Sequence, residues 1–139
     1  MFRGFATLSI YADDLASARD WYAELLGVEP YYAFPPPPAE PGYVEFRVGD
    51  DEDELGIIDR RYAPTAAADR PGGAVMFWHV DDLAGTLARL RAMGAVEHDP
   101  LTEREAGFAT ATVVDPFGNL LGVMHNPHYL EMLAARTRR

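Results

Sequence analysis

The sequence predicts an α+β fold made of two β-α-β-β-β modules and a short C-terminal helix. The residues Asp-Asp-Leu-Ala stand at positions 13–16 and again at positions 81–84. In both places an apolar run comes before them and a helical pattern follows them, which stops at a glycine, Gly27 or Gly94. Valine followed by glutamate comes soon after each glycine. One folding unit therefore occurs twice.

Composition indicates a single globular domain, 1–139, with 48% hydrophobic residues and a formal net charge of −10. The chain has no cysteine, which excludes disulfides and fits a cytoplasmic location. The chain has no signal-peptide layout, and no apolar run approaches the roughly 18 residues that span a bilayer. The negative charge disfavours nucleic acids and anionic membranes as partners and favours a cationic ligand.

The first module is expected over residues 5–59. Its first strand covers 5–11, and Asp13 or Asp14 then caps a helix that runs to about Leu26. Gly27 supplies the left-handed residue that ends the helix.

The rest of this module is expected to be a strand, a stiff loop and a hairpin. The strand covers 28–34, and four prolines at 35–38 end it. Strands at 43–48 and 55–59 form a hairpin across the acidic turn 50–54.

A linker at 60–73, rich in proline and glycine, leads to the second module, 74–124. This module repeats the plan, with a first strand at 74–80 and a helix that begins at Asp82 and ends at Gly94.

Three further strands complete the second module, at 95–98, 108–114 and 119–124. An asparagine and a proline then open the C-terminal helix, 126–137. Because a helix this short is marginal alone, we expect it to dock on the body or on a second chain.

Several short motifs follow one another in a fixed order. They are Ala12-Asp13-Asp14-Leu15, Trp21-Tyr22, Leu25-Leu26-Gly27, His79-Val80-Asp81-Asp82-Leu83, Gly94-Ala95 and Asp115-Pro116-Phe117-Gly118-Asn119. With them the chain resembles the vicinal oxygen chelate superfamily, which includes glyoxalase I, bleomycin-resistance proteins and extradiol dioxygenases. The resemblance spans about Phe5 to Met124. It implies two βαβββ modules with curled mixed sheets that form a cup, and a homodimer.

Metal-using members of this superfamily place four ligands in the cup, one on the first and one on the last strand of each module. The matching positions here fall on Thr7, Val75, Gly122 and near Gly56. Valine and glycine offer no side-chain ligand. We therefore expect no family metal and no cofactor.

Strand parity selects the side chains that would line the cup. We expect Thr7, Ser9, Tyr11, Phe77, His79 and Met124 to bind the ligand, with Glu45 and Arg47 if the polar side of strand 43–48 faces inward. His79 is a candidate catalytic base, a polar anchor, or a hydrogen-bonded histidine at a strand end.

Three hypotheses about function stay open. The first is a metal-free protein that binds a small organic molecule in an aromatic-lined cup. The second is a metal-dependent lyase, isomerase or dioxygenase of the glyoxalase type, with ligands from unusual places such as Glu54, Asp59, His79 or His125. The third is an interaction module whose cup its own side chains fill.

Overall fold

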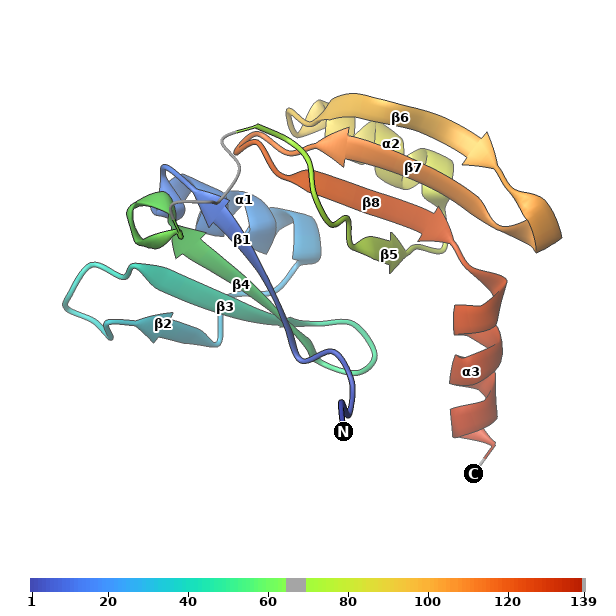
Figure 1. Ribbon diagram of the computed structural model, residues 1–139, viewed down its shortest axis with the longest axis horizontal. Coiled ribbons are helices and arrows are strands. Elements are labelled where there is room, and N and C mark those ends of the chain that lie inside the picture. Colours follow the sequence, from blue (N-terminus) through green and yellow to red (C-terminus); the bar gives the residue numbers. More distant parts are fainter. Residues whose placement is uncertain (65–69, 139) are drawn as a thin grey trace. The chain divides into compact units, whose positions relative to one another are not determined.

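The structure is a computed structural model that describes residues 1–64 and 70–138 (Figure 1). The chain divides into two compact units, Met1–Asp69 and Arg70–Arg139. Each unit has its own four-stranded sheet. The middle of the expected linker, residues 65–69, lies outside the described residues.

The elements of the first unit follow the predicted order. They are β1 (Thr7–Ala12), α1 (Leu15–Leu26), β2 (Tyr32–Phe34), β3 (Tyr43–Val48), β4 (Asp53–Asp59) and the 3-10 helix η1 (Arg60–Tyr62).

The second unit repeats this order and adds a helix. Its elements are β5 (Phe77–His79), α2 (Leu83–Ala92), β6 (Val96–Glu103), the 3-10 helix η2 (Glu105–Gly107), β7 (Ala109–Val114), β8 (Leu120–His125) and α3 (Pro127–Thr137).

The two sheets have the same topology, which confirms the predicted α+β fold of two βαβββ modules. The strand order is β1-β4-β3-β2 in the first sheet and β5-β8-β7-β6 in the second. Each sheet is mixed, because its first strand pairs in parallel with its last, while the other neighbours are antiparallel. The repeat seen in the sequence is thus a repeat of topology and strand pairing.

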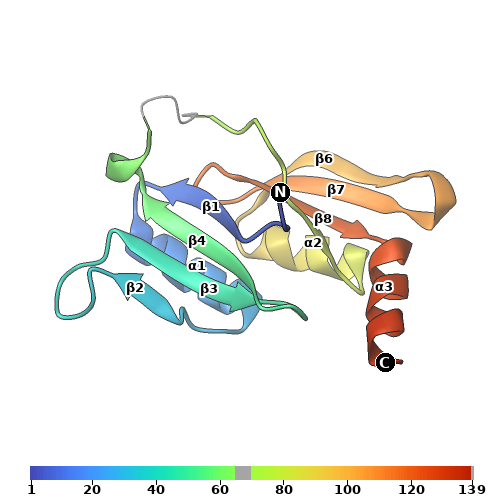
Figure 2. The ribbon, with the colours of Figure 1, turned by 60° about the horizontal axis from the view of Figure 1, so that its bottom comes forward.

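One face of the first sheet packs against α1 (Figure 2). Alternate residues of β3 and β4 form this core. They are Val44, Phe46, Val48, Leu55 and Ile57, and α1 adds Leu15, Ala18 and Tyr22. Full burial of one such side chain contributes about 1.5–3 kcal/mol, so this layer fixes the register of the sheet.

The second sheet packs against α2 in the same way (Figure 1). The buried residues are Leu83, Leu87 and Leu90 on α2 and Ala111, Val113, Leu121 and Val123 on β7 and β8.

The predicted helix starts are confirmed, and Asp14, not Asp13, is the cap of α1, whereas α2 ends at Ala92, just before the predicted Gly94. The side chain of Asp14 accepts a hydrogen bond from the Ser17 backbone N–H at 3.0 Å, and Asp82 accepts one from Gly85 at 2.9 Å. These caps satisfy backbone donors that the first turn leaves unpaired. Gly27 ends α1 in the left-handed region, with φ of 70°.

Two predicted strands are too long. The strand predicted at 28–34 is paired only from Tyr31, whose N–H donates to the Glu45 carbonyl. Pro30 precedes it and has no N–H to offer, so the pairing stops there. The strand predicted at 74–80 is reduced to Phe77–His79.

The strand predicted at 95–98 is too short, because β6 runs from Val96 to Glu103 and passes through Pro100. Register shifts between Glu97 and Thr102 absorb the proline. β6 is an edge strand, and an edge strand can lose one N–H without breaking the sheet.

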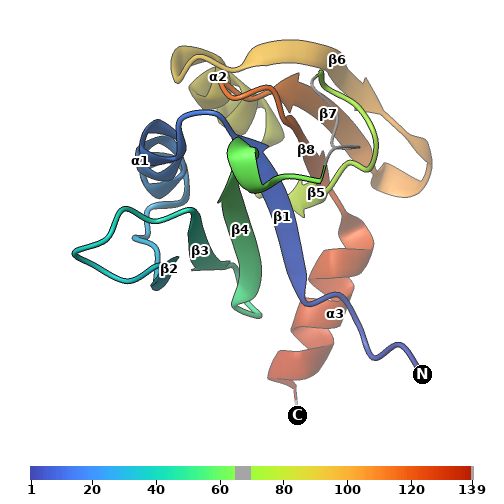
Figure 3. The same cartoon turned by 60° about the vertical axis from the view of Figure 1, so that its left-hand side comes forward.

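The C-terminal helix α3 begins as predicted, with Asn126 as its cap and Pro127 in its first turn. It continues from the end of β8 and leaves the sheet of the second unit (Figure 3). None of its residues is buried, and the side chains of Leu130 and Met132 are exposed. Within the described parts of the chain, no helix has both the length and the apolar character needed to cross a bilayer.

Candidate functional site

The side of the first sheet opposite α1 carries polar residues, and we call it the polar face. On β3 it presents Tyr43, Glu45 and Arg47, because Val44, Phe46 and Val48 point into the core. Gly56 lies directly across from Glu45, and Glu54 lies across from Arg47. The apolar side of strand 43–48 packs in the core, so its polar side is the one that faces away from α1.

The carboxylate of Glu45 is the centre of the polar face. It is only 7% exposed, and it accepts hydrogen bonds from the hydroxyls of Tyr31 and Tyr43, one at each oxygen. Burial acts to raise the pKa of Glu45, but the hydrogen bonds of Tyr31, Tyr43 and Glu54 and the charge of Arg47 together outweigh it, and the pKa is lowered. Glu45 is therefore an ionised acceptor.

Tyr43 is held as a hydrogen-bond donor. Burial, and then its bond to Glu45, raise the pKa of its phenol well above the usual range. Its ring lies against Gly56, where a Cβ atom would come within 2.6 Å of the Tyr43 hydroxyl. Only glycine at this position lets the ring lie on the sheet with its hydroxyl at Glu45.

Two further contacts cross the polar face. The Arg47 guanidinium lies over the Tyr31 ring, with 4.0 Å between Cζ and the ring centroid. On the neighbouring strands, the Thr7 hydroxyl donates to the Glu54 carboxylate at 3.0 Å. Charge and aromatic surface thus alternate over a short distance.

Exposed aromatic rings border this network on β2 and just before it. The ring centroids of Tyr31 and Tyr32 are 6.3 Å apart, and those of Tyr32 and Tyr43 are 6.2 Å apart. Tyr31 is 45% exposed, Tyr32 46% and Phe34 57%. Large exposed aromatic groups beside a buried charge are typical of ligand sites.

The predicted residues of β1 lie beside this network. Thr7 and Ser9 are exposed, and Tyr11 is half-buried. Ser9 pairs with Gly56, so β1 adjoins the strand under the Tyr43 ring.

In the second unit, the predicted residues Phe77, His79 and Met124 share one face of their sheet, since Phe77 pairs with Gly122 and His79 with Met124. The Phe77 ring lies against Gly122, where a Cβ would approach it to 2.7 Å. As at Gly56, an aromatic ring covers the glycine, but here the ring comes from the first strand of the unit, whereas Tyr43 lies on β3.

His79 holds the start of α3. Its Nδ1 accepts a hydrogen bond from the Asn126 backbone N–H at 3.0 Å, and its ring stacks on Tyr129 with centroids 4.9 Å apart. Nδ1 thus has no proton in this arrangement, which places the proton of the neutral imidazole on Nε2. Nε2 lies 3.5 Å from Asp81, and it is buried without a hydrogen bond. The catalytic role of His79 stays a prediction, and neither nitrogen has a lone pair to offer here.

Two contributors to the first unit's site were not predicted from the sequence. Tyr31 lies just before β2, and its hydroxyl reaches Glu45. Glu54 was expected only as a possible metal ligand, whereas its carboxylate accepts a hydrogen bond from Thr7. The alternation of Tyr43, Glu45 and Arg47 on β3 indicated a polar face, but nothing in the sequence indicated which residues of the neighbouring strands would reach it.

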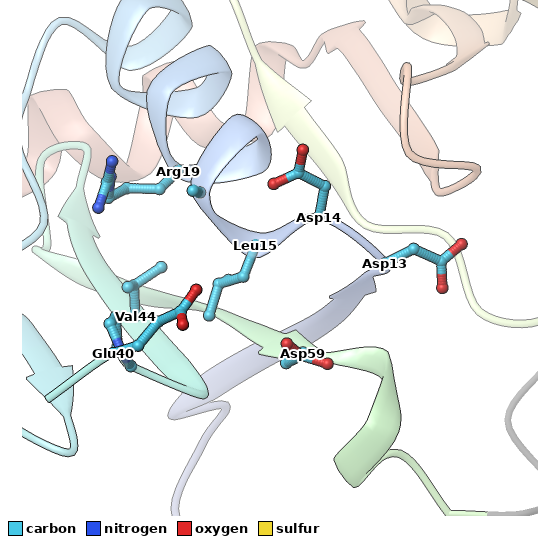
Figure 4. Close-up of a pocket in the computed structure, with 9 residues that line it drawn as sticks. Asp13, Asp14, Leu15, Arg19, Glu40, Val44 and Asp59 are labelled. Atoms are coloured by element: carbon cyan, nitrogen blue, oxygen red, sulfur yellow. The ribbon is translucent and has the colours of Figure 1, made fainter.

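A separate pocket of about 320 Å³ lies where α1 begins (Figure 4). Three of its four acidic side chains have structural partners: Asp14 caps α1, Asp13 pairs with Arg60 at 2.8 Å and Asp59 with Arg61 at 3.2 Å, while Glu40 is the fourth. These pairs explain the pocket as part of the junction between the helix and the sheet.

The residues at the family's metal positions do not fit a metal. The two glycines lie under aromatic rings, and Thr7 is paired with Glu54. In residues 1–64 and 70–138, no three His, Asp or Glu side chains come together as a metal site would need.

Two βαβββ units with the same sheet order define the class of the protein, the vicinal oxygen chelate fold. The family profile described as Glyoxalase/Bleomycin resistance protein/Dioxygenase superfamily matches residues 4–123, and the chain belongs to this superfamily. No curated protein matches the sequence significantly.

Solved structures with the same fold come from several branches. A glyoxalase-related enzyme from Fulvimarina pelagi is 20% identical with a TM-score of 0.70, over 91% of this chain and 90% of that one. A lactoylglutathione lyase from Agrobacterium tumefaciens is 22% identical with a TM-score of 0.65, over 88% and 93%. A bleomycin resistance determinant encoded on the transposon Tn5 is 21% identical with a TM-score of 0.60, over 90% and 99%. At these identities the likeness shows the fold alone.

Proposed function

We propose that the protein binds a small organic molecule on the polar face of the first sheet, without a divalent metal. The observation that carries this proposal is the buried, ionised carboxylate of Glu45, held between Tyr31 and Tyr43 beside exposed rings. A fixed charge in an otherwise aromatic surface orients a ligand, while the rings supply contact area.

The chemistry of the site favours binding over acid–base catalysis. A general base works best with a pKa near the operating pH, whereas the pKa of Glu45 is lowered and that of Tyr43 is raised. Both groups keep one protonation state at neutral pH, which suits an acceptor and a donor that recognise a ligand.

We propose further ligand contacts separately within each unit. On β1 we propose Thr7, Ser9 and Tyr11, which adjoin the polar face. In the second unit we propose Phe77, His79 and Met124, which share one face of their sheet.

A second candidate is an interaction module with a filled cup. The rings of Tyr43 and Phe77, which cover Gly56 and Gly122, favour it because they occupy space that a ligand would otherwise use. It predicts that no small molecule binds.

Native mass spectrometry of the purified protein, followed by a thermal-shift screen of small organic compounds and of Ni, Zn, Mn and Fe, tests these alternatives. We expect an organic ligand that raises the melting temperature, with an effect that Glu45→Gln reduces and Asp59→Asn, in the separate pocket, leaves unchanged. Stabilisation by a stoichiometric metal would support a lyase, isomerase or dioxygenase instead. No stabilising compound of any kind would support the interaction module.

We also propose that the protein is a cytoplasmic homodimer. The absence of cysteine fits a reducing compartment, and the exposed apolar side chains of α3 fit a second copy.

A further inference from the structure

We infer that the ligand group recognised on the polar face is a delocalised organic cation, such as an amidinium, and that Arg47 occupies its position in the free protein. This inference rests on the proposed function and adds the chemical class of the ligand. Arg47 acts in it as a specificity-determining residue.

The contact of Arg47 with Tyr31 is the first observation. Its guanidinium, a planar delocalised cation, lies 4.0 Å from the ring centroid. Arg47 is the one basic residue on the four strands of the first sheet, and its side chain is exposed. An exposed arginine can leave a ring face without losing buried contacts.

The groups around this contact are the second observation. The Tyr31 ring is followed by those of Tyr32 and Tyr43 at centroid separations of 6.3 and 6.2 Å. The hydroxyls of Tyr31 and Tyr43 meet the carboxylate of Glu45. Aromatic faces beside a carboxylate attract a weakly hydrated cation by ring electrostatics and by charge.

The strength of such contacts allows an exchange. A cation–π contact at an exposed site corresponds to about a two- to fivefold change in an equilibrium constant. Through this ring contact alone Arg47 competes weakly with a ligand cation, while its hydrogen bond to Tyr31 and the charges of Glu52 and Glu54 also favour its bound position. Removing it frees the Tyr31 ring and also removes a like charge from the site.

Titration with benzamidinium, followed by NMR of the tyrosine ring signals, tests the inference, and neutral benzamide is the matched probe. We expect benzamidinium to shift the signals of Tyr31 and Tyr43, and Arg47→Gln to tighten its binding about two- to tenfold. Glu45→Gln and Tyr31→Leu should each weaken it by a similar factor. Tyr31 is half-exposed, so Tyr31→Leu remains informative if the Glu45 variant is unstable.

Equal binding of benzamidinium and benzamide, or weaker benzamidinium binding by Arg47→Gln, would overturn the inference. These outcomes are distinct from a failure of the proposed function. A neutral or anionic ligand whose binding depends on Glu45 would agree with the proposed function and would contradict only the inference that the ligand is a cation.

Discussion

At the scale of single residues, Glu45 organises the polar face. Its carboxylate is buried on a sheet face whose other residues are polar or aromatic, and two tyrosines compensate its lost hydration. A hydrogen bond to a charged group contributes more than a neutral one, so we expect the charge of Glu45 to support stability in addition to the proposed binding.

Glu45→Gln keeps the shape of the side chain and removes its charge. We expect the free energy of unfolding at neutral pH to fall by about 1–2 kcal/mol. Because the pKa of Glu45 is lowered in the folded state, its contribution is present above the ordinary carboxyl pKa and is lost as the pH falls through the folded-state value. Urea unfolding at several pH values should show wild type and variant converging in acid. A constant difference down to about pH 3 would contradict this role.

Gly56→Ala tests the close approach of Tyr43. The added Cβ would meet the ring at 2.6–3.0 Å, so we expect a loss of about 1–3 kcal/mol in the free energy of unfolding. In a Tyr43→Leu background Gly56→Ala should lower the free energy of unfolding by less, because the ring is gone.

Gly122→Ala provides the matched contrast to Gly56→Ala. There the backbone oxygen of Met76 lies 2.9 Å from the added Cβ, so removing Phe77 should not relieve the clash fully. Equal costs of Gly56→Ala in both backgrounds would show that Tyr43 is not the reason for the glycine.

At the scale of secondary-structure elements, features that depend on neighbouring residues in the sequence were predicted correctly, such as helix caps. Features that depend on strand pairing, such as strand lengths, were not. The caps Asp82 and Asn126 were predicted, and the first cap was narrowed to Asp13 or Asp14, because a cap is decided within four residues of the chain. The extents of β2 and β6 were wrong, because Pro30 and the register shifts act through the partner strand. The contact of Tyr31 with Glu45 could not be predicted for the same reason, since it depends on how β2 pairs with β3.

The attachment of α3 is testable through His79. His79→Asn retains a side-chain acceptor for the Asn126 N–H, whereas His79→Phe retains only the stack on Tyr129. We expect amide hydrogen exchange in the first turn of α3 to be faster in His79→Phe than in His79→Asn. Equal protection of the two variants would show that the hydrogen bond to Asn126 does not hold the helix.

At the scale of the whole molecule, the internal repeat determines the architecture. Each unit has one helix on one face of a mixed sheet, and in each a glycine of the last strand lies under an aromatic ring. The identical strand order follows from the repeated sequence pattern. The sheet face opposite this helix differs between the units. In the first unit it carries the charged network around Glu45, and in the second it carries His79, which accepts a hydrogen bond at the start of α3.

We expect the protein to be a dimer in solution, with α3 in the interface. Leu130 is 37% exposed and Met132 46%, and a short helix with exposed apolar residues needs a surface to cover it. Light scattering after size exclusion should give twice the chain mass of 15.4 kDa at micromolar concentration. Replacing both residues with glutamine should shift the equilibrium toward the monomer. A wild-type protein that is monomeric at this concentration would contradict the assignment.

The central claim is that a small organic ligand binds at Glu45 on the polar face of the first sheet. Side-chain and amide NMR shifts on adding the compound found in the thermal-shift screen test it most directly. We expect the largest shifts to fall on Tyr31, Tyr43 and their neighbours on β3, and Glu45→Gln to weaken binding without moving the site. Shifts confined to the pocket where α1 begins, or binding that requires an added metal ion, would contradict it.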